Sequence, residues 1–310
     1  MRIQAFGVPA LAAFIALSAA SAAPPAPLLA QDAPPPSTVD ITKNLKRPGN
    51  ADWASTVDEA RERAAAEKKL VYYEVSGPDC DDCIRMQSVL YPAFDFEALL
   101  IGMVPIQLEL TSADAKKLAQ IYPIREIPSV AITTPTGRLV FLTQGFKNQR
   151  DFFVHVHKSL ADYREWAKTI DAQDVPSLSA ADAMRSANQL YGRFDFAEAR
   201  PRYKRASAAP DATRAIRDGA LEGLAACELS LDQPVQARKS IDQLIQTTKD
   251  PEAKERAELF RAQIPLSQKQ YDEALALYKK FEKDHPNSKY LEKVRGFIAH
   301  LQPSDNPNPK

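Results

Sequence analysis

The feature that most constrains this chain is a pair of cysteines, Cys80 and Cys83, at the junction of two differently patterned runs. Before the pair, residues 70–75 are β-branched and aromatic, which is typical of a buried strand. After it, a helical pattern continues to about residue 100. Two cysteines separated by two residues can close a small disulfide ring. A sulfur at a helix N-terminus also lies beside unsatisfied backbone N–H groups that favour its thiolate. The motif therefore predicts dithiol–disulfide chemistry.

The runs on either side of the motif alternate between helical and strand-like patterns. We expect a helix from near Trp53, strands at 103–110, 129–133 and 139–143, and helices at 114–121 and about 148–170. The dipeptide Thr136-Gly137 predicts the turn between the last two strands. This order predicts an α/β fold in which one sheet is covered by helices on both faces.

Residues 51–170 resemble the thioredoxin superfamily, in its exported branch, through five features. The CxxC pair follows the first long strand, and Ile127-Pro128 matches the family's cis-proline step. The other matches are Gly137 at the hairpin, Gly145 at the end of the last strand, and Glu74 six residues before Cys80. One feature departs, because Gly77-Pro78-Asp79 replaces the family's usual tryptophan before the first cysteine. The resemblance implies a thioredoxin-like fold with a mixed sheet.

The resemblance also implies a role for each residue of the site. Cys80 would attack a substrate disulfide as a thiolate, and the more buried Cys83 would resolve the mixed disulfide. Glu74 would carry a proton to or from Cys83. Ile127 and Pro128 would bind the substrate chain by offering neighbouring backbone for a short β-pairing. No cofactor and no metal is implied.

Other interpretations of the same residues stay open. The cysteine pair is also compatible with a structural disulfide. Metal binding is the weakest alternative, because there is no second cysteine pair and the four histidines show no ligand spacing to the first. Glu74 is equally compatible with a half-buried carboxylate paired with Lys68 or Lys69. The third cysteine, Cys227, is interpreted as a small buried hydrophobe.

Acidic residues surround the first cysteine, at Asp79, Asp81 and Asp82. Like charges disfavour a neighbouring thiolate, which makes the reduced form less stable and the couple more reducing. The pattern thus predicts a reductant or isomerase rather than a strong oxidant. Acidic residues also stabilise a helix N-terminus, so they have a purely structural explanation as well.

An internal repeat occupies residues 183–302. Ala199, Ala237 and Ala274 are spaced 38 and 37 residues apart. Twelve residues before them lie Ala187, Ala225 and Ala262, and four residues after them lie Tyr203, Ile241 and Tyr278. Small residues at a helix crossing, followed one turn later by a bulky one, suit stacked helical hairpins. The pattern resembles the tetratricopeptide repeat. This resemblance implies an all-α domain of helical hairpins that docks protein or peptide clients.

The ends of the chain predict export. Residues 1–22 are interpreted as a cleavable signal peptide, because a basic start precedes a short apolar stretch and the small-x-small site Ala20-Ser21-Ala22. A membrane anchor is the alternative, although the stretch is shorter than a bilayer span. We expect a Pro/Ala-rich disordered spacer at 23–50, a linker at 171–182 and a disordered tail at 303–310. Forty basic and forty acidic residues give zero formal charge, so nothing favours nucleic acid as a partner.

Together these features predict a thiol–disulfide oxidoreductase of the periplasm or cell envelope, fused to a protein-docking repeat domain. Its partners would be protein thiols and disulfides, clients of the repeats and an electron donor supplied from outside the chain. The alternative is a non-enzymatic envelope adaptor, in which the first domain is a platform and the cysteine pair is structural.

Overall fold

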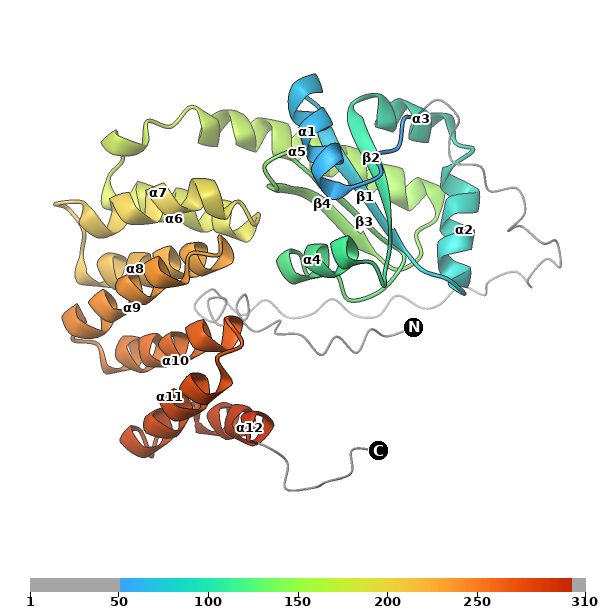
Figure 1. Ribbon diagram of the computed structural model, residues 1–310. Helices are drawn as coiled ribbons and strands as arrows, with labels where there is room; N and C mark the ends of the chain where they lie inside the picture. The colour runs from blue at the N-terminus through green and yellow to red at the C-terminus, as the bar shows by residue number, and fades with distance from the viewer. Residues whose placement is uncertain (1–50, 303–310) are drawn as a thin grey trace, which may run out of the picture. The chain divides into compact units, whose positions relative to one another are not determined.

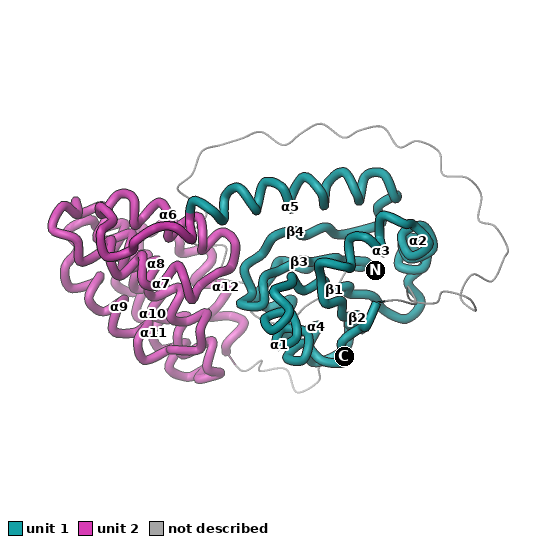
Figure 2. The backbone as a smooth tube through the Cα atoms, turned by 90° about the horizontal axis from the view of Figure 1, so that it is seen from above, with its two compact units in different colours: residues 1–169 teal, residues 170–310 magenta. Residues whose placement is uncertain are grey.

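The computed structural model describes residues 51–302. The chain divides into two compact units between Thr169 and Ile170 (Figure 2). The stretches predicted as signal peptide, spacer and tail lie outside the described residues. Among the helices of residues 51–302, none combines the length and apolar character that a membrane span needs.

The first unit is built on a four-stranded mixed sheet (Figure 1). Its strands are β1 (Leu70–Ser76), β2 (Met103–Glu109), β3 (Ser129–Thr133) and β4 (Leu139–Gln144), in the order β2-β1-β3-β4. β1 pairs parallel with β2 and antiparallel with β3, which pairs antiparallel with β4. All four strands lie where the sequence predicts them, because each is a run of β-formers between turn residues.

Helices cover both faces of this sheet. They are α1 (Val57–Glu67), α2 (Asp81–Leu90), α3 (Phe94–Ile101), α4 (Ala113–Ile121) and α5 (Gln149–Asp171). Successive residues of a strand face opposite sides of the sheet, so the contacts of neighbouring residues in β1 show which helices cover each face. Tyr72 packs into a core with residues of α2, α3 and α5, whereas the hydroxyl of Tyr73 accepts a hydrogen bond from Arg61 of α1. Figure 2 shows α5 on one side of the strands and α1 and α4 on the other.

The helix predicted from Cys80 to about residue 100 is wrong in one respect, because the structure divides it into α2 and α3. α2 ends at Leu90, a turn follows at Tyr91 and Pro92, and α3 begins at Phe94. Proline breaks the helix here because it has no backbone N–H and its ring clashes with the carbonyl four residues earlier. As a result, Tyr91 lies just past the end of α2 with its ring buried in the core.

All regular secondary structure in the described residues of the second unit is helical. A short 3₁₀ turn at Val175–Ser177 precedes α6 (Ala180–Gly192), α7 (Phe196–Ala208), α8 (Arg214–Ser230), α9 (Pro234–Thr247), α10 (Pro251–Ser267), α11 (Tyr271–Asp284) and α12 (Leu291–Leu301). Each helix from α6 onward packs against the next one in the chain. The six alanines that define the repeat are all fully buried: Ala187, Ala199, Ala225, Ala237, Ala262 and Ala274. The helical region therefore fits the predicted repeat.

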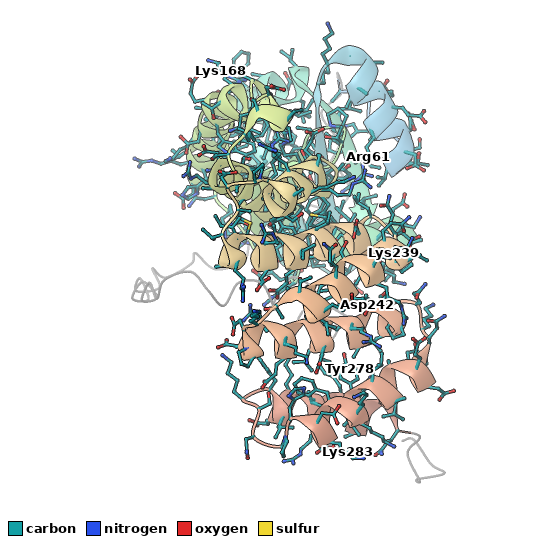
Figure 3. All side chains as sticks on the ribbon, turned by 90° about the vertical axis from the view of Figure 1, so that its left-hand side faces the viewer. Arg61, Lys168, Lys239, Asp242, Tyr278 and Lys283 are labelled. Carbon is teal, nitrogen blue, oxygen red and sulfur yellow. A yellow bond between two sulfur atoms is a disulfide. The ribbon has the colours of Figure 1, made fainter. Side chains whose placement is uncertain are left out.

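The bulky residues of the repeat fill the interior between these helices. Tyr203, Ile241 and Tyr278 are all buried. Tyr203 donates a hydrogen bond to the side-chain oxygen of Asn188 at 2.7 Å. Tyr278, labelled in Figure 3, stacks on Phe297 with 5.1 Å between ring centroids. These aromatic residues are core residues, as the sequence pattern indicates.

The segment predicted as a linker, residues 171–182, and Ile170 just before it make defined hydrogen bonds within the second unit. The buried guanidinium of Arg202 donates to the carbonyl of Ile170 at 3.2 Å. Arg205 donates to the carbonyl of Leu178 at 2.8 Å, and the backbone N–H of Ala180 donates to Asp211 at 3.0 Å. Side chains of α7 and of the residues after it therefore contact backbone groups between Ile170 and Ala180.

Candidate functional site

The two cysteines of the CxxC motif form a disulfide at the start of α2. Cys80 is the N-cap residue, and its sulfur accepts a hydrogen bond from the backbone N–H of Cys83 at 3.2 Å. Cys80 is half-buried, whereas Cys83 is 3% exposed. The positions are therefore unequal, since a reagent from solvent reaches the first sulfur more easily than the second.

The loop before the motif lies against the residues predicted to bind substrate. The Ile127-Pro128 peptide bond is cis, as the sequence predicts. β1 and β3 pair at Val75 and Ser129, so their extensions bring the loop from Gly77 alongside Ile127. A Cβ placed on Gly77 would lie 3.0 Å from Cδ1 of Ile127. The structure thus brings the predicted binding residues next to the segment that leads into Cys80.

Glu74 is a carboxylate buried beneath α2, with 1% of its surface exposed. It accepts hydrogen bonds from the amide of Gln87 at 2.6 Å and from the hydroxyl of Tyr91 at 3.1 and 3.2 Å. The hydroxyl of Tyr72 and the amide of Gln107 each approach it at 3.5 Å. Burial, followed by the nearby charge of Glu74, raises the pKa of Tyr72 well above its usual value, so this phenol stays a neutral donor. The carboxylate is held by neutral side chains.

Of the two lysines named as alternative partners of Glu74, Lys69 contacts another carboxylate. Lys69 forms an ion pair with Glu67 at 2.7 Å, and Lys68 is the left-handed C-cap residue of α1. Glu74 lies beneath the helix that begins after Cys80, and the sequence analysis names neither of its donors Gln87 and Tyr91. A signal was available, because both follow Cys83 at multiples of four residues and so share one face of a helix.

The acidic residues beside Cys80 are exposed in the first turn of α2 or just before it. Asp79 has a left-handed backbone, with φ of 55°. Asp82 forms an ion pair with Arg85 at 3.1 Å, and Arg85 in turn lies 4.3 Å above the ring of Phe146. Part of the acidic charge next to the disulfide is therefore balanced by a cation one turn along the helix.

The third cysteine and one of the histidines, His285, have defined surroundings within the second unit. Cys227 is fully buried in α8, where burial raises the pKa of its thiol well above the usual value. His285 lies 2.6 Å from a carboxylate oxygen of Glu258 in the second unit. Within residues 51–302, no three His, Cys, Asp or Glu side chains come together in a way that could hold a metal ion.

Comparisons with known proteins find a likeness among solved structures. No protein-family model matches the chain, and no curated protein matches it. Among solved structures, the chain is similar to one titled "DsbH Oxidoreductase", at 16% sequence identity and a TM-score of 0.31. The match covers 36% of this chain and 86% of that one. A likeness of this size identifies no activity, which has to come from the site itself.

Proposed function

We propose that the chain is an exported thiol–disulfide oxidoreductase of the thioredoxin-like type. The observation that supports it is the difference in exposure between the two bonded cysteines. Cys80 caps α2 and is half-buried, whereas Cys83 is almost fully buried. Exchange chemistry needs one sulfur that a client can reach and one that only its neighbour can reach. A purely structural disulfide needs no such difference.

The exchange proceeds in two balanced steps. In the reduced protein, the thiolate of Cys80 attacks one sulfur of a client disulfide. The client S–S bond breaks, and the departing client thiolate takes up a proton from solvent. Cys83 then loses its proton and attacks the sulfur of Cys80, which closes the internal disulfide and releases the second client thiolate. Two electrons have passed to the client, and a dithiol donor outside the chain restores the reduced form.

Two further groups assist this reaction in the proposal. The backbone beside Ile127 and Pro128 pairs with the client chain, since it borders the loop into Cys80. Glu74 accepts the proton that Cys83 must lose. The exposed acids Asp81 and Asp82 disfavour the thiolate of Cys80, so the couple is biased toward reduction or isomerisation of client disulfides.

The second unit supplies the docking function in this proposal. Its successive helices, with buried alanines at the repeated positions, support a tetratricopeptide-like stack that binds protein or peptide clients. The second candidate function is a non-enzymatic envelope adaptor, which the helical stack alone would serve. An adaptor requires no thiolate, whereas the exchange enzyme passes through a covalent intermediate.

The deciding experiment combines equilibration with glutathione and trapping. The wild-type protein should reach a redox equilibrium with glutathione through Cys80 and Cys83, and Cys83→Ser should accumulate mixed disulfides with envelope proteins. Cys80→Ser serves as the matched control and should trap none. If Cys83→Ser traps no client although the repeats still capture proteins, the adaptor function replaces the enzyme.

A further inference from the structure

Two of the side chains that hold Glu74, Gln87 and Tyr91, come from α2 and the residue that ends it. Gln87 follows Cys83 by one helical turn on α2, and side chains four residues apart on a helix have Cβ atoms about 6 Å from each other. The amide of Gln87 donates to Oε1 of Glu74 at 2.6 Å. The carboxylate is therefore tied to the turn of α2 next to Cys83.

Tyr91 provides the second hydrogen-bond donor to Glu74, and its ring is held in place by other aromatic rings. It stacks on Phe96 with 5.5 Å between ring centroids and lies 6.2 Å from the ring of Trp53. Its hydroxyl reaches both carboxylate oxygens of Glu74, at 3.1 and 3.2 Å. Because Tyr91 lies at the end of α2 and is 6% exposed, the carboxylate is fixed relative to the helix by two separate contacts.

We propose that Gln87 and Tyr91 are positioning residues for thiol–disulfide exchange: they hold the Glu74 carboxylate at the turn of α2 next to Cys83 and thereby set the acidity of the Cys83 thiol. The inference rests on the proposed function. A negative charge held near Cys83 disfavours its thiolate, and buried charges are screened little by salt. Removing either donor lets the carboxylate take up a proton or move away, and both changes weaken its field at the sulfur.

The test titrates Cys83 alone. In reduced protein carrying Cys80→Ser, thiolate absorbance in the far ultraviolet is followed against pH. Glu74→Gln should lower the titration midpoint of Cys83 by about one pH unit, the size expected from a charge several ångströms away in a partly screened interior. Tyr91→Phe, which removes only the hydroxyl, and Gln87→Met should each lower the midpoint of Cys83 by about half a pH unit, roughly half the effect of Glu74→Gln, because the other donor still holds the carboxylate.

The decisive readout is the combination with Glu74→Gln. In that background Tyr91→Phe and Gln87→Met should cause no further shift, because both act through the carboxylate. Ser88→Ala is the matched control on α2, since Ser88 donates only to the carbonyl of Arg85 in this helix, and it should leave the midpoint unchanged. Near-ultraviolet circular dichroism of the packed aromatic rings verifies that each variant is folded.

Two results would overturn the inference. Shifts that persist in the Glu74→Gln background mean that Gln87 and Tyr91 act through packing alone. No shift in either single variant means that the carboxylate needs neither of them. The proposed function fails separately, when the wild-type protein does not exchange with glutathione at all.

Discussion

Replacing Gly223 with alanine tests whether Tyr203 packs directly against the backbone of α8. A Cβ on Gly223 would lie 2.5 Å from both Cε1 and Cζ of Tyr203 and 2.9 Å from Cδ1. Non-bonded carbons are most stable about 3.5–4.0 Å apart, so the methyl would overlap the ring by about 1 Å. The ring has little freedom to move, because Tyr203 is 1% exposed and its hydroxyl donates to Asn188.

The size of the effect follows from two opposing contributions. Overpacking a buried site costs about 1–3 kcal/mol, and overlap with three ring atoms belongs at the upper end of that range. Alanine in place of glycine within a helix stabilises it by about 1 kcal/mol. The free energy of unfolding should therefore fall by about 2 kcal/mol.

Urea unfolding followed by far-ultraviolet circular dichroism measures this loss. Two matched glycines serve as controls. A Cβ on Gly219, also in α8, would meet only the flexible end of Met184 at 3.1 Å, and a Cβ on Gly296 in α12 would meet nothing within 4 Å. Both alanine variants should be neutral or more stable by up to about 1 kcal/mol. If Gly223→Ala is as stable as Gly219→Ala, the close packing of Tyr203 on α8 is refuted.

Three further predictions concern the charged and nucleophilic side chains. Alkylation of the reduced protein near neutral pH should label Cys80 before Cys83, and peptide mapping that finds the reverse order contradicts the proposed attacking sulfur. Changing Asp81 and Asp82 together to asparagine should make the couple more oxidising in glutathione equilibration, and an unchanged or more negative potential argues against the charge effect. Burial raises the pKa of Glu228, so the folded state binds its proton more readily than the unfolded state does and loses stability as pH rises through that folded pKa. Glu228→Gln should therefore stabilise the protein more at pH 8 than at a pH below the ordinary pKa of a glutamate, near pH 4, in urea titrations, and equal stabilisation at both would show that its charge carries no cost.

Local patterns suffice to predict much of the fold and the centre of the site. The strands are predicted from runs of β-branched and aromatic residues, and the cysteine pair is recognised by its two-residue spacing. Both predictions need only neighbouring residues and no long-range information. The donors to Glu74 are different, because their spacing from Cys83 places them on one helix face, whereas only the position of α2 over β1 shows that they reach Glu74. The prolonged helical pattern after Cys80 hides the end of α2 at Leu90, since the residues after Pro92 are also good helix formers.

The start of the second unit likewise depends on contacts between residues far apart in the sequence, and these contacts can be tested. Its polar composition favours a fragment beginning at residue 183, yet that cut removes Ser179, whose side chain caps α6, together with the first turn of the helix. It also removes the backbone groups that Arg202 and Arg205 bind, at Ile170 and Leu178. A buried guanidinium that loses its acceptor is costly, so fragment 170–302 should unfold at a higher urea concentration than fragment 183–302. Comparing both fragments by circular dichroism measures this difference. Equal midpoints would mean that the hydrogen bonds between α7 and residues 170–178 add nothing to the stability of the helical stack.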